Sequence, residues 1–340
     1  MNARARGFSL VELMVAITLG LVLLAGVAQV FVNSKQGYRV QDSVGRLQEN
    51  ARYASGYLSQ YIRMADLWSG IKPSQVALVG AVAYSGPGSC TNGWVVDPNS
   101  GIVGYSGDSS GTALTYPNGL PSGCIGSSTT GSYINGSDVL AIRYVDPNTY
   151  VNTATLTAAA SSLSSNGKFY LRTLVGKRAD LFDVTGSGLT SAVADLPGDA
   201  VDGVLNFQYQ TVVFFLLNAD NGQGLTPTLY MLTLQSDALT AQPLVDGIEM
   251  LKFEYGLDTN GDGRVDQYAV ASSLATTDWP KVISVRASFI ARGDAIDGYT
   301  DTQSYTMTGA GYVYTPPTAV AKYQRRLIVR EIQLRNRVRQ

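Results

Sequence analysis

The sequence predicts an α+β protein in which one long N-terminal α-helix packs against a large, mostly antiparallel β head. Two observations support this prediction. No proline occurs before Pro73, so no ring interrupts a helix in the first part of the chain. Between about residues 138 and 334, many short strand patterns follow one another, with few helical patterns among them. A chain of 340 residues, 45% of them hydrophobic, is long enough for one large head or two small ones.

The N-terminus consists of a short basic leader, residues 1–7, and an apolar segment, residues 8–32. The apolar segment is about 25 residues long, which suffices for a helix to cross a hydrocarbon core of roughly 30 Å. It is too long for the apolar region of a secretory signal peptide, and no A-x-A site with a polar mature start follows it. We therefore expect residues 8–32 to remain on the protein as the transmembrane half of the helix.

Residues 33–69 are predicted to continue the helix as an amphipathic half. Apolar residues recur there in steps of three and four, which is the spacing of one helical stripe. The stripe consists of Val40, Val44, Leu47, Ala51, Ala54, Leu58 and Ile62. A continuous helix over residues 8–67 would be about 90 Å long at 1.5 Å per residue. Its first half would lie in a membrane, and its second half would pack against a sheet.

Glu12 is the one carboxylate in the apolar segment. A charged group within a membrane helix is costly, and such residues are candidates for a function. The alternative is that Glu12 lies near the helix end and reaches the lipid headgroups. The residue type and its position leave both interpretations open.

The whole N-terminal string is more specific. Gly7-Phe8-Ser9-Leu10-Val11-Glu12-Leu13, followed by an apolar helix, resembles the processing site of type IV prepilins and type II secretion pseudopilins. The resemblance implies that a membrane prepilin peptidase cleaves after Gly7 and that Phe8 becomes the N-methylated first residue. It also implies that Glu12 pairs with the α-ammonium group of a neighbouring subunit, so that two charges leave lipid together. The implied fold is type IV pilin-like.

The predicted head comprises residues 70–340. Strand patterns cover residues 139–145, 168–175, 181–184, 204–217, 228–235, 248–255, 267–270, 282–291, 304–307 and 326–334. Several alternate apolar and polar residues, as residues 284–289 do, which is typical of a sheet with one solvated face. Residues 212–217 are all apolar and predict a buried strand or an interface.

Charge and composition exclude several functions. Histidine is absent, which excludes Ser-His-Asp and Cys-His catalytic arrangements and histidine-containing zinc sites. No nucleotide-binding or hydrolase motif occurs. The net charge is −1, but residues 322–340 carry seven basic and one acidic residue, whereas residues 70–321 carry 11 basic and 21 acidic residues. The basic end fits either a nucleic-acid contact or a final amphipathic strand with a charged face.

Residues 84–137 are predicted to form a long looped excursion that contains both cysteines, Cys90 and Cys124. In an exported head a disulfide between them is the natural interpretation, and two free thiols are the alternative. A disulfide closing such a loop would stabilise the fold by roughly 3–4 kcal/mol in the chain-entropy model. The excursion fits either a surface-recognition element or a loop without a partner.

One loop has the spacing of a metal site. Oxygen-bearing residues at alternate positions, a glycine at position six and a carboxylate at position nine match the start of an EF-hand-like calcium loop. The candidate ligands are Asp258, Asn260, Asp262, Arg264 through its backbone carbonyl, and Asp266. Ala269 replaces the usual glutamate at position twelve, and strand-like segments flank the loop. The alternative is a β-hairpin turn, since Asn-Gly and Asp-Gly favour turns.

Short pieces of the head resemble PilW-type minor pilins. These pieces are Asp138-Val139-Leu140, residues 243–249, residues 253–258, Trp279 before a strand, and the closing Leu334-Arg335-Asn336-Arg337. The larger minor pseudopilin of type II secretion resembles the same group.

The two resemblances together imply a structural protein rather than an enzyme. The expected function is that of a minor pilin, incorporated into type IV pili and helping to initiate assembly near the tip. The expected partners are other minor and major pilins, the prepilin peptidase, the inner membrane and the pilus assembly machinery, and no nucleic acid. The head would lie in the periplasm before assembly and outside the cell afterwards. The alternatives are a tip adhesin and a minor pseudopilin of a type II secretion system.

Overall fold

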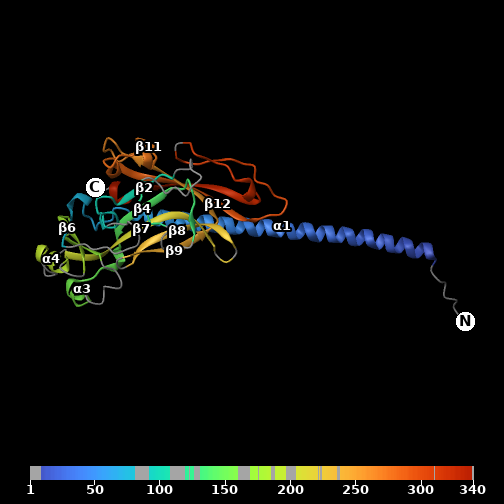
Figure 1. Ribbon diagram of the computed structural model, residues 1–340, viewed down its shortest axis with the longest axis horizontal. Coiled ribbons are helices and arrows are strands. Elements are labelled where there is room, and N and C mark those ends of the chain that lie inside the picture. Colours follow the sequence, from blue (N-terminus) through green and yellow to red (C-terminus); the bar gives the residue numbers. More distant parts are fainter. Residues whose placement is uncertain are drawn as a thin grey trace.

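The structure is a computed structural model. It describes residues 9–80, 92–107, 119–121, 123–125, 131–159, 169–174, 176–184, 188–196, 204–220, 222, 224–235, 238–309 and 311–338. A single helix, α1 (Leu10–Met64), projects from a β-rich head over about half of its length (Figure 1). The predicted α+β architecture is confirmed.

The larger of the two main sheets has a mixed order but mostly antiparallel pairing. Its central path is β1-β6-β5-β7-β4-β2, β3 and β8 also pair with β7, and β9 pairs with β8. Only β1 and β6 are parallel among the described strands. The members are β1 (Val76–Leu78), β2 (Ile102–Tyr105), β3 (Ser132–Tyr133), β4 (Val139–Val145), β5 (Phe169–Leu174), β6 (Arg178–Asp183), β7 (Val204–Asp220), β8 (Leu225–Gln235) and β9 (Ala238–Asp246).

The smaller sheet is antiparallel throughout, with the order β11-β10-β12-β15. Its strands are β10 (Ile248–Leu257), β11 (Gln267–Ala269), β12 (Val282–Ala295) and β15 (Tyr323–Gln333). A two-stranded sheet pairs β13 (Tyr305–Thr306) with β14 (Val313–Tyr314). The short helices are α2 (Asn92–Val95), α3 (Thr153–Ala159), α4 (Gly188–Asp195), α5 (Arg335–Val338), η1 (Pro73–Gln75), η2 (Pro147–Thr149), η4 (Ala271–Ser273), η5 (Trp279–Lys281) and η6 (Thr318–Val320).

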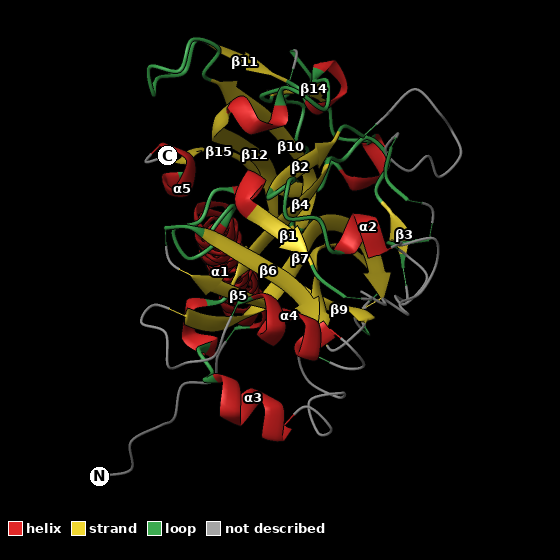
Figure 2. Cartoon of the chain, turned by 90° about the vertical axis from the view of Figure 1, so that its left-hand side faces the viewer, coloured by secondary structure: helices red, strands yellow, loops and turns green. Residues whose placement is uncertain are grey.

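The second half of α1 lies against both main sheets (Figures 1 and 2). Its buried residues are Ser43, Leu47, Ala51, Ala54, Leu58 and Ile62, five of which belong to the apolar stripe predicted from the sequence. These five share one hydrophobic core with residues of β4, β7 and β8 on one side and of β10, β12 and β15 on the other. A second core covers the opposite face of the larger sheet. The helix is therefore the element that joins the two sheets.

The strand pattern predicts most of the observed strands, with one long exception. β9 was not expected, because Pro243 interrupts its sequence and proline cannot donate to a strand ladder. In the structure β9 pairs only with β8 among the described strands, and the register shifts next to the pair Tyr230–Pro243. Proline is tolerated at such an edge and irregularity.

The predicted excursion contributes to the core in its described part. β2 pairs with β4 at the edge of the larger sheet, and Ile102 is fully buried there. Val95 and Val96 are also buried, in the second core. Any shortening of residues 84–137 must therefore spare these residues.

A buried ion pair connects the two main sheets at their seam. The Asp138 carboxylate, directly before β4, accepts hydrogen bonds from the Lys252 ammonium (3.0 Å) and from the backbone N–H groups of Phe253 (2.8 Å) and Gly107 (2.9 Å). Burial raises the pKa of Asp138, although Lys252 and the two N–H groups act in the opposite direction. The cost of removing the Asp138 carboxylate from water therefore outweighs its attraction to the Lys252 ammonium, as is common for buried ion pairs.

We expect Asp138→Asn to lower the free energy of unfolding by about 3–5 kcal/mol, because it leaves the Lys252 ammonium buried without its counter-charge. The double variant Asp138→Asn, Lys252→Met removes both charges and should recover most of that loss. Chemical unfolding of the detergent-solubilised protein, followed by circular dichroism, measures both. Equal stability of the single variant and the unmodified protein would show that the Asp138–Lys252 ion pair does not stabilise the fold.

Candidate functional site

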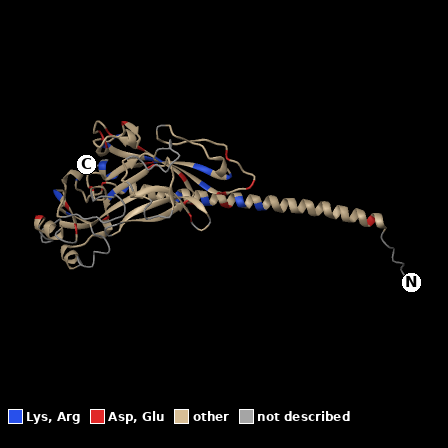
Figure 3. Cartoon of the chain, viewed as in Figure 1, with Lys and Arg blue, Asp and Glu red and all other residues tan. Residues whose placement is uncertain are grey.

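The projecting half of α1 is apolar and fully exposed. Large apolar side chains from Leu10 to Val32 are mostly more than half exposed, for example Leu10 at 74% and Phe31 at 68%. This is the one described helix with the length and apolar composition to span a membrane. Figure 3 shows it almost free of charged residues. An apolar surface of this size needs lipid or other helices around it.

The helix begins with a capping box. The Ser9 hydroxyl accepts a hydrogen bond from the Glu12 N–H, and the Glu12 carboxylate accepts one from the Ser9 N–H, both at 3.4 Å. These bonds satisfy two of the backbone donors that a helix N-terminus leaves open. Glu12 thus lies in the first turn of the helix, at its outer end. Gly7 and Phe8, the predicted processing residues, lie outside the described residues.

The C-terminus of the chain fastens the other end of α1. Arg337 donates to the Asp66 carboxylate just after the helix, to the Trp279 carbonyl and to the Val282 carbonyl (2.9 Å). Asn336 donates to the Ala65 carbonyl at 2.9 Å. Asp66 is buried and has a left-handed backbone (φ 57°), which aims its carboxylate into this site. The end of α1, η5 and the start of β12 are therefore tied together by two residues of α5.

A third buried cluster lies on the smaller sheet around Glu249. Its carboxylate accepts hydrogen bonds from Arg325 (3.0 Å), Arg292 (3.1 Å) and the Tyr314 hydroxyl (2.9 Å), and Arg325 also binds Asp301 (3.2 Å). Burial opposes the charge of Arg325, but its hydrogen bonds and attraction to Glu249 raise its pKa. Burial beside the Glu249 charge raises the pKa of Tyr314. The cluster joins β10, β12, β14 and β15.

These clusters explain the short PilW-like pieces of the sequence. Asp138, Glu249 and Arg337 each make one of the buried ionic contacts, and Tyr255 packs edge-on against Trp279 with ring centroids 4.8 Å apart. The pieces thus supply residues to contacts within the smaller sheet, between the two sheets, and between the end of α1 and α5. Their partners were not predicted, because Asp66 and Arg337 are 271 residues apart and no local pattern links them.

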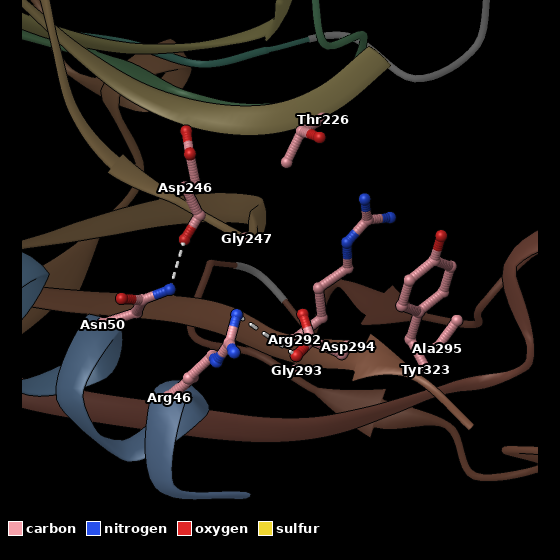
Figure 4. Close-up of a pocket in the computed structure, with 10 residues that line it drawn as sticks. All are labelled: Arg46, Asn50, Thr226, Asp246, Gly247, Arg292, Gly293, Asp294, Ala295 and Tyr323. Atoms are coloured by element: carbon pink, nitrogen blue, oxygen red, sulfur yellow. Dashed lines mark hydrogen bonds and ion pairs between the residues drawn. The ribbon is translucent and has the colours of Figure 1, made fainter. Parts of the chain in front are cut away.

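A polar cleft of about 440 Å³ lies between α1 and strands of both main sheets (Figure 4). Asn50 donates to the Asp246 carbonyl at 3.0 Å, and Arg46 lies 3.6 Å from Asp294. Figure 4 shows both contacts reaching from the helix to the strands on the two sides of the cleft. Arg292, which also lines the cleft, is paired with Glu249. With these charges already matched within the chain, the cleft serves to fasten the helix.

The predicted calcium loop folds as a tight exposed turn between β10 and β11. The Asp258 carboxylate accepts hydrogen bonds from the N–H groups of Gly261 (2.6 Å), Asp262 (3.2 Å) and Gly263 (2.8 Å). Gly263 has φ +80°, a conformation that glycine adopts easily. The Asp258 carboxylate therefore points into the turn, where hydrogen bonds from the backbone N–H groups of the turn surround it.

The remaining candidate ligands make similar local bonds. Asn260 accepts from the Asp262 N–H, and Asp262 from the Arg264 N–H, both at 2.8 Å. The hydroxyl (2.6 Å) and the N–H (2.7 Å) of Thr259 donate to Asp266 and lower its pKa. Among the described residues, no group of three or more His, Cys, Asp or Glu is arranged to hold a metal ion. Calcium binding stays a prediction.

The predicted disulfide also stays a prediction. Cys124 is buried in the second core, at 1% exposure, whereas Cys90 lies outside the described residues.

Comparison with known protein families gives two matches. The family described as type IV pilus-assembly protein W, PilW, matches residues 213–336, and the prokaryotic N-terminal methylation motif matches residues 2–28. Among solved structures, a type IV-like pilin, TTHA1219 from Thermus thermophilus, aligns with 14% identity and a TM-score of 0.25. That alignment covers 54% of this chain and 96% of the other. No curated protein matches the chain.

The methylation motif on an exposed apolar helix, joined to a β head, is the arrangement expected of the type IV pilin class, which this chain resembles. Within that class, the match over residues 213–336 confirms the resemblance to PilW-like pilins that the sequence predicted. This region contains both Glu249 and Trp279. The apolar helix that carries this motif has the length and composition to span a membrane.

If the turn binds calcium, the affinity should fall at about 10⁻⁴–10⁻³ M, the usual range for extracellular modules. Isothermal titration of the detergent-solubilised protein with calcium chloride measures it. Asp258→Asn should abolish binding, because it removes the charge that three loop N–H groups surround.

Asp220→Asn is the matched control. Asp220 also accepts hydrogen bonds from two N–H groups of an exposed turn, those of Gly222 and Gly224, but lies outside the predicted site. Absence of heat at millimolar calcium, or equal loss in both variants, would contradict the prediction.

Proposed function

We propose that this chain is a minor pilin that is built into type IV pili and helps to initiate their assembly near the tip. The observation that carries the proposal is the division of one continuous helix. Its outer half is apolar and exposed, and carries the prepilin-type motif, whereas one face of its inner half is buried against the two sheets. Such a helix can leave the bilayer and enter a bundle of similar helices while its head stays folded.

The first step is processing at the N-terminus. The prepilin peptidase would cleave after Gly7, and Phe8 would become the N-methylated first residue. Before assembly the helix anchors the protein in the inner membrane, with the head in the periplasm. Removal of residues 1–7 also removes Arg4 and Arg6, two basic charges that hinder the movement of this end of the helix out of the bilayer.

Glu12 would guide the second step, entry into the filament. In the described chain its carboxylate is exposed and makes only the weak capping contact with Ser9. In an apolar bundle an unpaired carboxylate is costly, so pairing with the α-ammonium of a neighbouring subunit favours the correct axial register. Other minor and major pilins and the assembly machinery are the partners that this step requires.

The size of the head supports a minor position. Residues 70–340 form a head of about 270 residues that projects widely around the end of α1 (Figure 1). A head of this size would pack poorly in a repetitive shaft, whereas one copy at the tip has free space on its outer side. The same reasoning applies to a type II secretion pseudopilus, which is the alternative assembly.

We expect mass spectrometry of sheared filaments to find this chain starting at N-methylated Phe8. A Glu12→Ala variant should be processed in the same way but be reduced at least about tenfold in the filament fraction, because the carboxylate no longer offsets a buried ammonium. Quantitative mass spectrometry of filament and membrane fractions measures both effects.

Glu49→Ala, an exposed carboxylate on the head-bound half of α1, is the matched control and should be incorporated normally. An unprocessed chain starting at Met1 and confined to the membrane would overturn the proposal. Recovery with secretion-system subunits instead of pilins would identify the alternative filament.

A loop replacement separates assembly from adhesion. Exchanging residues 108–118 for a short Gly-Ser linker spares β2 and the buried residues of the second core. If the chain acts in assembly, loss of the whole protein should reduce the number of pili, and the loop variant should restore both pili and surface attachment. Pili without attachment would instead support the adhesin alternative. Electron microscopy and an attachment assay on the same strains give the answer.

A further inference from the structure

Strand β15 leaves one of its edges open. Among the described strands only β12 pairs with it, along the side that carries the pairs Ser284–Gln333 to Ala295–Tyr323. The opposite edge presents a row of backbone N–H and C=O groups that no described strand satisfies. Val329, in the second half of this strand, is 45% exposed. A long open edge of this kind accepts an added strand unless something blocks it.

A groove of about 560 Å³ separates this strand from α1. Arg52 of α1 and Arg326 and Arg330 of β15 line it. All three are exposed, and none forms an ion pair with a described carboxylate; Arg330 reaches only the Ser55 hydroxyl, at 3.3 Å. Figure 2, which looks along α1, shows helix and strand as neighbours at one side of the head. The groove is therefore basic and uncompensated, in contrast to the polar cleft of Figure 4.

The two strand arginines share one face. Side chains of a strand alternate, so Arg326, Ile328 and Arg330 point to the same side. Ile328 packs against the main core that contains the α1 stripe, which places the arginines on either side of it, facing the groove. At about 3.3 Å per residue their backbones lie roughly 13 Å apart. A partner strand would match them with acidic residues four positions apart.

A second copy of this strand does not match them. An antiparallel pairing of two β15 strands centred on Ile328 sets Arg326 of one copy against Arg330 of the other. Like charges directly opposite one another destabilise a strand pair. The arginines thus disfavour self-association in this register and favour an acidic partner.

We propose that the open edge of β15, together with the basic groove beside α1, binds an extended acidic segment of a different protein, which adds to the smaller sheet as a strand. Backbone hydrogen bonds along the edge supply affinity, and carboxylates opposite Arg326 and Arg330 supply selectivity. The site is independent of the role in filament assembly, since it needs only the folded head.

The probe is a fluorescent seven-residue peptide of threonine and valine with two glutamates four positions apart, mixed with the full chain in detergent. Fluorescence anisotropy should show binding that weakens as salt increases. The double variant Arg326→Gln, Arg330→Gln should raise Kd by roughly 2- to 30-fold, as expected for two lost cross-strand charge pairs. The double variant Lys72→Gln, Lys177→Gln, which removes two exposed charges elsewhere, should leave Kd unchanged.

Two further probes test the binding mode. The double variant Arg326→Glu, Arg330→Glu should reject the acidic peptide and bind its lysine counterpart, which also shows that the variant is folded. Methylation of alternate backbone nitrogens on the peptide should abolish binding, and hydrogen exchange of β15 amides should slow only with the unmethylated peptide.

Three outcomes would overturn the proposal. The first is absence of binding of the acidic peptide, in which case the arginines only protect the edge of β15 from pairing with a second copy. The second is equal binding of the acidic peptide and a glutamine analogue. The third is concentration-dependent dimerisation through β15 in sedimentation experiments, since a second copy would then occupy the edge. None of these bears on N-terminal processing or on incorporation into pili.

Discussion

The packing of the α1 stripe between the two sheets is the interaction on which the rest of the structure depends. Leu47, Leu58 and Ile62 fill the main core, while Ala51 and Ala54 let the strands approach the helix closely. Each sheet covers this stripe from a different side, so the sheets contact the helix as well as each other. If the stripe were lost, the main core would lose the element that lies at its centre.

The two halves of this one helix therefore need different environments. Residues 10–32 need lipid or neighbouring helices, whereas the stripe needs the head, and no proline or sharp break separates the two. The ionic contacts lie at the edges of this arrangement. Arg46 and Asn50 fasten the helix to β12 and β9, and Asp66 fastens its end to the C-terminus. A force along the helix is thus transmitted to both sheets rather than to one loop.

The sequence predicts what depends on local pattern. The stripe of α1, the all-apolar segment 212–217 of β7 and the alternating strand β12 could be located, because neighbouring residues alone show these patterns. Ser43 was missed, since its burial depends on hydrogen bonds with the backbone of Asp294, 251 residues away. The pairing of Asp138 with Lys252 was missed for the same reason. Their roles become visible only when the sheets are assembled.

The basic C-terminus illustrates this limit most clearly. The sequence shows seven basic residues among the last nineteen, which suggests one charged surface. The structure divides them according to the alternation of β15 and the turn of α5. Arg325 and Arg337 are consumed in buried ion pairs that hold the head together, whereas Arg326 and Arg330 remain exposed without an acidic partner among the described residues. Adjacent arginines on one strand thus have different roles. Arg325 stabilises the fold, whereas Arg326 remains exposed and can contact a partner.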